Sequence, residues 1–146
     1  MSRISDILAH KGSQVFTIPE DATVIAALAE MERHNTGSLV VLRGSDVAGI
    51  FTERDLARRV ALAGRDVEQT RVREVMTAQV ICIENGATVH DAMTLMTQER
   101  IRHLPVVGPG GMCGVVSIGD LVQSLAAEQE VEIRYLTAYI RGELSV

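Results

Sequence analysis

The sequence predicts an α/β protein made of two β-α-β-β-α units that pack with pseudo-twofold symmetry. The first observation behind this is an internal repeat, in which residues 15–56 align without a gap on residues 80–121, at an offset of 65 (80 minus 15). The second is that both copies show the same order of strand and helix patterns. The third is composition: the residues AVILMFWYC make up 47% of the 146 residues and aromatic residues only 3%, which indicates an aliphatic core. The chain is long enough for one domain, or for two halves that share a core.

The repeat is strongest at apolar and small positions. The residues of the first copy that meet an identical residue in the second are Val15, Ile18, Ala22, Thr23, Val24, Ala27, Met31, Leu39, Val41, Gly49, Asp55 and Leu56. Several other pairs exchange one apolar residue for another. One supersecondary unit built twice explains this pattern, and a cleft between two such units would carry each polar feature twice.

Each copy is expected to open with a short strand, at 15–18 in the first and at 80–83 in the second. A threonine, Thr23 or Thr88, then stands at the N-cap position of a helix. The helix continues with apolar residues at spacings of three and four, which form its core face. These residues are Val24, Ala27, Leu28 and Met31 in the first copy and Val89, Ala92, Met93 and Met96 in the second.

Two further strands, joined by turn residues, form a hairpin in each copy. The expected strands are 39–42 and 47–51 in the first copy, and 104–107 and 112–116 in the second. A second helix is expected to begin at Thr52 in the first copy and at Ser117 in the second.

The ends of the copies divide the chain into three parts. Residues 4–8 resemble residues 72–76, which indicates a short helical lead-in before each copy. We therefore expect the first motif with its lead-in helix at 1–70, the second motif at 71–127 and a helical extension at 128–146. In the extension an apolar stripe packs either on the chain's own core or on another subunit. The residues of this stripe are Ile133, Leu136, Tyr139 and Ile140.

Charge and composition argue against several classes of protein. A net charge of −5 without a basic stripe disfavours nucleic-acid binding. No segment approaches the roughly 18 apolar residues of a membrane span, and the N-terminal residues do not resemble a signal peptide. Cys82 and Cys113 are expected to be buried, reduced thiols, in keeping with a cytoplasmic protein. The histidines at 10, 34 and 90 lack metal-ligand spacing and are assigned to the surface, so neither a metal nor a required cofactor is expected.

One polar motif occurs in both copies, Gly-x-x-(Thr/Ser)-x-x-Asp at residues 49–55 and 114–120. In each, a strand ends at a hydroxyl residue that opens a helix, and an aspartate stands three positions on. One explanation is a helix cap, in which the hydroxyl accepts a backbone N–H bond and the aspartate suits the helix dipole. The other is a ribose phosphate site, in which the helix N–H groups and the hydroxyl bind phosphate and the aspartate accepts from two ribose hydroxyls. Gly49 and Gly114 leave room for a ligand or for another backbone.

The duplicated unit, the paired motif and the run Arg102-His103-Leu104-Pro105-Val106-Val107 resemble CBS domains, from about Ile4 to about Ala126. Two such motifs form a Bateman module, and the chain length is similar to that of small stand-alone bacterial CBS-domain proteins. The resemblance implies a regulatory module that binds an adenosyl ligand (AMP, ADP, ATP, NAD or S-adenosylmethionine) in the cleft between the motifs. We place AMP first and NAD second among these ligands, although both share adenosine and phosphate.

By the same resemblance, phosphate and ribose would be held by Thr52 and Asp55 in one site and by Ser117 and Asp120 in the other. The base would lie against the first strand of a copy and the residues around the start of its second strand. These residues are Phe16, Thr17, Thr36, Gly37 and Ser38 in the first copy, and Ile81, Cys82, Ile101, Arg102, His103 and Pro105 in the second.

The two copies differ where Arg54 of the first motif meets Gly119 of the second. Arginine can bind phosphate through two parallel bonds, so the first site is expected to tolerate more negative charge. Lys11, just before the first strand, is a further candidate phosphate contact. Each has a plainer explanation: Arg54 and Lys11 as solvated surface charges, and His103 as a structural strand residue.

We therefore expect a sensor module rather than an enzyme, which responds to an adenine nucleotide by a conformational shift. The expected partners are a second copy, paired through helical faces, and an unidentified regulated protein, with no nucleic acid and no membrane. The alternative is a ligand-free structural or protein-interaction module. Catalysis is disfavoured because the sequence offers no nucleophile-plus-base pair, metal cluster or Walker-type loop.

Overall fold

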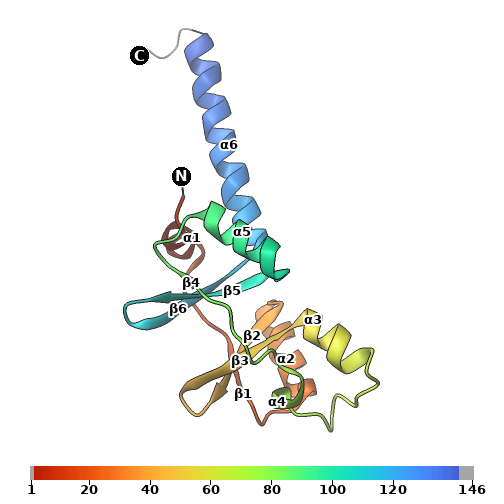
Figure 1. Ribbon diagram of the computed structural model, residues 1–146. Coiled ribbons are helices and arrows are strands. Elements are labelled where there is room, and N and C mark those ends of the chain that lie inside the picture. Colours follow the sequence, from red (N-terminus) through yellow and green to blue (C-terminus); the bar gives the residue numbers. More distant parts are fainter. Residues whose placement is uncertain (1, 142–146) are drawn as a thin grey trace. The chain divides into compact units, whose positions relative to one another are not determined.

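The computed structural model describes residues 2–141, which fall into two compact units (Figure 1). Residues 15–81 form one of them, called here the first-motif unit. The chain up to Gln14 and the chain from Cys82 onward form the other, called here the second-motif unit. Each unit holds one three-stranded sheet and its own helices, so the predicted α/β class and the twice-built β-α-β-β-α order are confirmed.

The first-motif unit has the sheet order β1-β2-β3, in which β1 and β2 are parallel and β2 and β3 form an antiparallel hairpin. Its elements are β1 (Thr17–Pro19), α2 (Val24–His34), β2 (Ser38–Arg43), β3 (Asp46–Thr52), α3 (Glu53–Asp55), the π-helix η1 (Leu56–Ala61) and α4 (Val72–Val75). The hairpin and the helices fall where the periodicity predicts them. The first strand is shorter and begins two residues later than expected.

The second-motif unit repeats this arrangement with the sheet order β4-β5-β6, again parallel and then antiparallel. Its elements are α1 (Ile4–Lys11), β4 (Ile83–Glu84), α5 (Val89–Glu99), β5 (His103–Gly108), β6 (Gly111–Ser117) and α6 (Ile118–Ile140). The helical extension expected at 128–146 continues α6 as far as Ile140, and residues 142–146 of that range lie outside the described residues.

The lead-in helices are exchanged between the motifs. At the start of α1, the N–H groups of Ile4 and Ser5 donate to the carbonyls of Ala87 and Asn85, both at 2.9 Å. At the start of α4, Val72 and Arg73 donate in the same way to the carbonyls of Ala22 and Glu20, at 2.8 and 3.0 Å. Each helix thus begins on the strand–helix turn of the motif that it does not precede. Each compact unit therefore includes the lead-in helix that precedes the other motif in the sequence.

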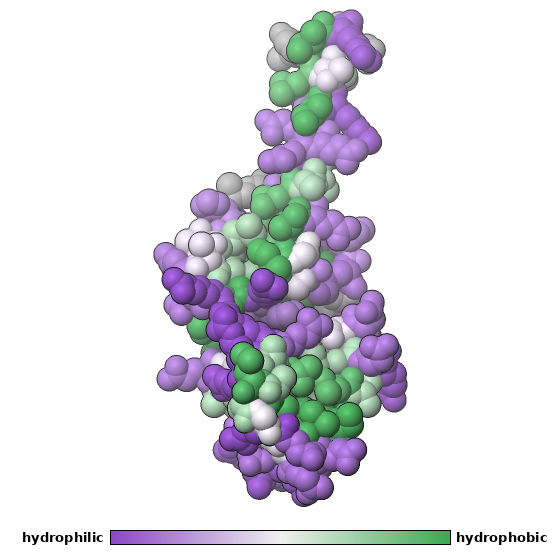
Figure 2. Space-filling view, turned by 90° about the vertical axis from the view of Figure 1, so that its right-hand side faces the viewer, coloured by the Kyte–Doolittle hydropathy of each residue, from purple (hydrophilic) through white to green (hydrophobic). Residues whose placement is uncertain are grey.

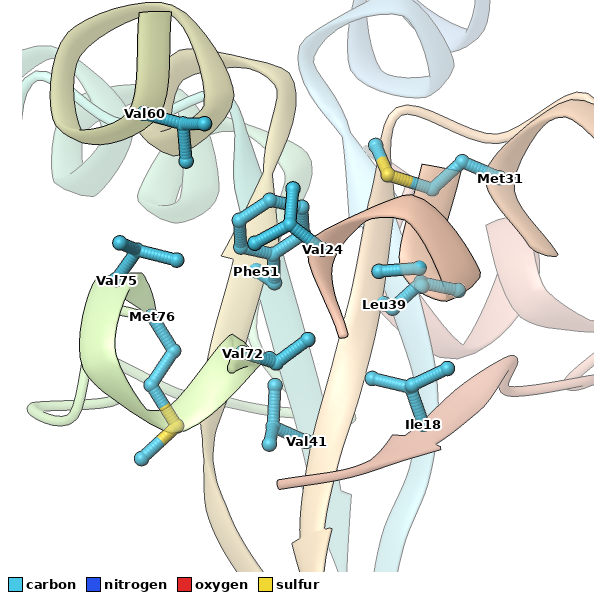
Figure 3. Close-up of a cluster of buried hydrophobic side chains, with 11 residues drawn as sticks. Ile18, Val24, Met31, Leu39, Val41, Phe51, Val60, Val72, Val75 and Met76 are labelled. Atoms are coloured by element: carbon cyan, nitrogen blue, oxygen red, sulfur yellow. The ribbon is translucent and has the colours of Figure 1, made fainter. Parts of the chain in front are cut away.

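The core of the first-motif unit lies between its sheet and the helices α2, η1 and α4 (Figure 3). Phe51 of β3 is fully buried at its centre, and Val72 and Val75 of the exchanged α4 contact the same cluster. Burying one such side chain stabilises a fold by about 1.5–3 kcal/mol relative to leaving it exposed. The exchanged helix therefore contributes to the hydrophobic core and is not a surface linker.

Matched caps begin the long helix of each copy, as the sequence predicts. The Thr23 hydroxyl accepts from the N–H of Ala26 at 3.3 Å, and the Thr88 hydroxyl accepts from the N–H of Asp91 at 3.1 Å. At their C-terminal ends Asn35 and Arg100 adopt the left-handed conformation, with φ of 49° and 55°. This conformation lets the chain turn directly into the second strand.

Two features depart from the expected repeat. After the first motif the helix continues as the π-helix η1, with a bond from the N–H of Leu62 to the carbonyl of Ala57, whereas α6 is a regular helix. The expectation of two buried cysteines is wrong, because Cys82 is exposed and Cys113 half-buried, and both are free thiols. Among the described residues no helix is both long and apolar enough to cross a membrane.

Candidate functional site

Both polar motifs lie at the point where the last strand of a sheet becomes a helix. Thr52 ends β3 and Ser117 ends β6. The hydroxyl of Thr52 accepts from the N–H of Asp55 at 3.3 Å, and the Asp55 carboxylate accepts from the N–H of Thr52 at 3.0 Å. The matching distances for Ser117 and Asp120 are 3.2 and 2.8 Å. Each hydroxyl–aspartate pair is thus a reciprocal helix cap, which fixes both side chains at the first turn.

Asp55 is buried, with only 6% of its surface exposed. Its Oδ2 atom accepts from Thr52, while its Oδ1 atom accepts from the hydroxyl of Thr77 at 3.0 Å. Arg59 lies 3.7 Å from the same Oδ1 atom and donates to the carbonyl of Met76 at 2.7 Å. Both carboxylate oxygens therefore have partners, and two of these partners tie Asp55 to the end of α4.

Asp120 is more open, with 23% of its side chain exposed. The Lys11 ammonium group, at the end of α1, donates to its Oδ2 atom at 2.7 Å and to the carbonyl of Val115 at 2.9 Å. The bonds from Lys11 and from the backbone N–H of Ser117 both end on the Oδ2 atom of Asp120. Burial alone would raise the pKa of Asp120, but the bonds from Lys11 and Ser117 outweigh it and lower that pKa. Asp120 is therefore ionised near neutral pH.

The segment before each second strand meets the start of the motif helix. The carbonyl of Gly37 accepts from the N–H of Glu53 at 3.1 Å, and that of Arg102 accepts from the N–H of Ile118 at 2.8 Å. In the sheets, Ser38 stands opposite Thr52 and His103 opposite Ser117. The structure therefore brings these predicted base contacts next to the predicted phosphate contacts within each unit.

Phe16 has a neighbour that sequence reasoning missed. Its ring stacks on the His34 ring, with centroids 4.0 Å apart and planes 13° apart, and His34 also contacts Glu30 at 3.1 Å. The carbonyl of Phe16 accepts from the N–H of Val40, which places this pair beside β2. We assigned His34 to the surface, yet it continues the helical spacing of Ala27 and Met31. This spacing could have shown from the sequence that His34 lies on the same helix face as Ala27 and Met31.

The remaining predicted contacts are spread along the strand ends. Thr36 donates its hydroxyl to the carbonyl of Ser38, which orders the chain before β2. Thr17 is exposed in β1 opposite Val40, Ile101 is half-buried after α5, and Pro105 is buried in β5 opposite Val115. Arg54 is exposed on α3.

Two of the predicted base contacts for the second copy fall on either side of the boundary between the units. Ile81 is half-buried and ends the first-motif unit, whereas Cys82 begins the second-motif unit. Desolvation raises the pKa of the Cys82 thiol, although the residue as a whole is exposed. The thiol is therefore protonated near neutral pH and acts as a weak donor rather than as a nucleophile.

The two motif glycines make room for the exchanged lead-in segments. A Cβ on Gly49 would lie 2.5 Å from the backbone carbonyl oxygen of Thr77. A Cβ on Gly114 would lie 2.7 Å from a terminal methyl of Leu8, in α1. From the sequence, either a ligand or another backbone could approach these glycines. In the structure a backbone lies beside Gly49 and a side chain lies beside Gly114. Among residues 2–141 no group of three or more His, Cys, Asp or Glu side chains could hold a metal ion.

Comparison with known proteins gives the same assignment for both halves of the chain. The family model described as "CBS domain" matches residues 4–62 and 72–127. The chain is 40% identical to the CBS domain-containing protein CBSX3, mitochondrial, of Arabidopsis thaliana, over 95% of this chain and 72% of that protein. It is 36% identical to the CBS domain-containing protein YhcV of Bacillus subtilis, over 83% of this chain and 84% of that protein.

A solved structure extends this likeness to the fold. It is that of a putative signal-transduction protein with CBS domains from Burkholderia ambifaria, with a TM-score of 0.84 and 42% sequence identity. The match covers 88% of this chain and 96% of that one. CBS-domain proteins of this stand-alone kind are regulatory modules. On the duplicated fold, the paired motifs and these matches, the chain belongs to the CBS-domain family.

Proposed function

We propose that this protein is a sensor that binds an adenine nucleotide at its hydroxyl–aspartate motifs and passes the signal on through a conformational shift. The observation that carries the proposal is the second motif, where the partly exposed Asp120 carboxylate lies beside Ser117 and the Lys11 ammonium group. A carboxylate acceptor, a hydroxyl and a cation together suit a ribose phosphate.

The second motif supplies complementary groups for a ribose phosphate. A ribose hydroxyl can donate to the Oδ1 atom of Asp120 without breaking the existing cap, because the cap bond ends on Oδ2. The Ser117 hydroxyl can donate to a phosphate oxygen while it still accepts from the N–H of Asp120. Lys11 carries a positive charge within reach of this motif, and its bond to Asp120 can be exchanged for one to phosphate. We therefore propose the second motif as the site that fills first.

The first motif would bind by a different route. Thr77 and Thr52 already occupy the Asp55 carboxylate, so a ribose hydroxyl has to replace the bond from Thr77. Thr77 follows α4, whose residues lie in the core of this unit. Ligand binding at the first motif would therefore shift α4 toward a second arrangement, which is the proposed conformational signal.

The ligand-free structural module stays the second candidate, and one observation favours it for the first motif alone. Asp55 is buried and both its oxygens accept hydrogen bonds within the unit, as a purely structural cap requires. At Asp120 the Lys11 pair likewise anchors α1, but the carboxylate is more exposed than that of Asp55, with 23% of its side chain exposed. The sensor role therefore depends chiefly on the second motif.

The identity of the ligand, the oligomeric state, the protein partner and the location are proposals as well. We propose AMP as the first ligand to test and NAD as the second, a homodimer paired through helical faces, and a regulated protein that reads the signal. We retain the predicted cytoplasmic location, although the name of the Arabidopsis relative assigns that protein to mitochondria.

Thermal unfolding with AMP, ADP, ATP, NAD and S-adenosylmethionine tests the proposal. A ligand at 100 times its Kd should stabilise the protein by about 2.7 kcal/mol. Asp120→Asn should abolish most of this shift, whereas Asp55→Asn should leave the first binding event intact. The matched control is Asp91→Asn, which alters an equivalent cap on α5 outside the motif. Unchanged melting temperatures with every adenine compound at millimolar concentration would refute the sensor role and favour the structural module.

A further inference from the structure

Helix α6 changes character along its length. Its first turns pack within the second-motif unit, where Leu121 is fully buried, and Glu128 accepts from the backbone N–H of Ser2 at 2.6 Å. Beyond Glu128 the helix extends past the other elements of its unit (Figure 1). Apolar side chains reach the surface there between charged ones (Figure 2). None of the described side chains between Gln129 and Arg141 is buried.

The exposed apolar residues follow a heptad. Starting at residue 122 and alternating steps of four and three, one line along α6 meets Val122, Ala126, Gln129, Ile133, Leu136 and Ile140. At about 100° per residue these six lie within roughly 40° of a common direction. The exposed fractions are 51% for Val122, 63% for Ile133, 49% for Leu136 and 81% for Ile140. We call this line the α6 seam.

The α6 seam faces away from the core of its own unit. Leu121 and Glu128, which contact that unit, both lie about 100° or more from the seam direction. The apolar stripe expected from the sequence therefore does not pack on the chain's own core for its described side chains, Ile133, Leu136 and Ile140. The side chain of Tyr139 lies outside the described residues.

The residue types on the seam fit one kind of partner. In heptad notation Ile133 and Ile140 occupy position a and Leu136 occupies position d. β-branched residues at a with leucine at d favour parallel two-stranded coiled coils. Gln129, at another d position, would meet its own equivalent, and the two amides can hydrogen-bond to each other. A single polar layer of this kind fixes register and orientation.

The flanking charges favour the same orientation. In a parallel pair Glu132, at position g, would face Thr137 of the second copy, and Glu130, at position e, would face Leu125. No two like charges then stand opposite each other across the seam. An antiparallel pair that matches the whole seam would instead bring Glu130 against Glu130 and Glu132 against Glu132. Like charges in contact disfavour that arrangement.

From these observations we infer that α6 forms a parallel two-stranded coiled coil with α6 of a second copy of this chain, along the α6 seam. The inference gives the proposed homodimer a specific contact. It rests on the proposed homodimer alone and is independent of nucleotide binding. The two chains of the dimer would then be joined through their α6 helices.

The mass of the full chain in solution, measured without nucleotide by sedimentation equilibrium, tests the inference. The wild-type chain should be dimeric at micromolar concentration. Leu136→Glu should weaken dimerisation by roughly 100-fold, because each dimer would bury two unpaired carboxylates. Val131→Glu is the matched control, since Val131 is 65% exposed on the same helix but lies off the seam. A monomeric wild type, or a Leu136→Glu chain that dimerises as the wild type does, would overturn the inference.

Disulfide trapping decides the orientation. In a background with Cys82→Ser and Cys113→Ser, Ile140→Cys should give an oxidised dimer, because position 140 meets its own equivalent in a parallel pair. Val131→Cys should not. If Ile140→Cys cross-links only when Val122→Cys is present on the other chain, the helices are antiparallel and the parallel coiled coil is wrong. Nucleotide binding, measured separately by thermal shift, is unaffected by either result.

Discussion

The ammonium group of Lys11 lies 2.7 Å from the Oδ2 atom of Asp120 and joins the lead-in helix α1 to the second motif. Thr77 does the same for Asp55 in the first motif, with a hydroxyl in place of the ammonium group. Each motif aspartate is thus both a helix cap and an anchor for a lead-in segment. The chemistry of the anchor, charged in one copy and neutral in the other, makes the two motifs respond differently to pH and to substitution.

Lys11→Met should make stability less sensitive to acid. Because the pKa of Asp120 is lowered in the folded state, its stabilising effect is present above the unfolded pKa of about 3.9 and is lost as the pH falls through and below that value. The half-exposed ion pair contributes about 0.5–1 kcal/mol at neutral pH. Urea unfolding at about pH 7 and pH 3 measures both effects.

The comparison is internally controlled, because Asp91 also has a lowered pKa from its bonds to Thr88 and is unchanged in both proteins. The difference in unfolding free energy between wild type and Lys11→Met should be largest at pH 7 and smaller at pH 3. If the difference persists unchanged at low pH, Asp120 is not the partner that makes Lys11 stabilising.

Thr77→Val should lower the free energy of unfolding markedly, although the Thr77 side chain is only half-buried. The change keeps the shape of the side chain but removes the donor to Asp55, which is buried. A buried carboxylate that loses a donor costs about 1–3 kcal/mol of unfolding free energy. Chemical denaturation measures the change.

Thr97→Val is the matched control for that substitution. The Thr97 hydroxyl donates to the carbonyl of Met93 on an exposed face of α5, so its loss should change stability by less than about 0.5 kcal/mol. Equal effects of the two substitutions would show that Thr77 does not anchor Asp55.

Much of this architecture could be predicted from the sequence, because it depends on local pattern. The offset of 65 between the copies, the caps at Thr23 and Thr88 and the hairpins all follow from residue spacing. The exchange of the lead-in segments could not, since Ile4 resembles Val72 equally well whichever motif it packs on. That is why Lys11 was assigned beside the first strand although its ammonium group bonds to Asp120.

The sequence predicts which residues form the candidate site, but not how exposed each of them is. The motif identifies Asp55 and Asp120 as equivalents, and both are caps in the structure. Their different partners, Thr77 and Lys11, lie outside the repeat and carry no signal in it. The stack of Phe16 on His34 likewise has no counterpart in the second copy, where Ile81 and Glu99 occupy the matching positions.

Arg54→Gln tests the predicted asymmetry in charge tolerance. If Arg54 binds phosphate, the substitution should weaken ATP binding by about 1.5–3 kcal/mol and leave adenosine binding nearly unchanged. Gly119, its counterpart, has no side chain to contribute, so Gly119→Gln serves as the matched control at the second motif. Isothermal titration of ATP and adenosine measures both. Equal weakening of the two ligands by Arg54→Gln would contradict a role in phosphate binding.

The motif glycines make a final comparison between the copies. Gly49→Ala forces a Cβ to within 2.5 Å of the backbone oxygen of Thr77, whereas Gly114→Ala meets a terminal methyl of Leu8 at 2.7 Å. Backbone in a paired bridge between Ile50 and Thr77 cannot move cheaply, but the end of a leucine side chain can change rotamer. We expect a loss of about 3 kcal/mol for Gly49→Ala and about 1 kcal/mol for Gly114→Ala, measured by urea unfolding. Equal losses, or a larger loss at Gly114, would show that the lead-in segments do not approach the two strands in these two ways.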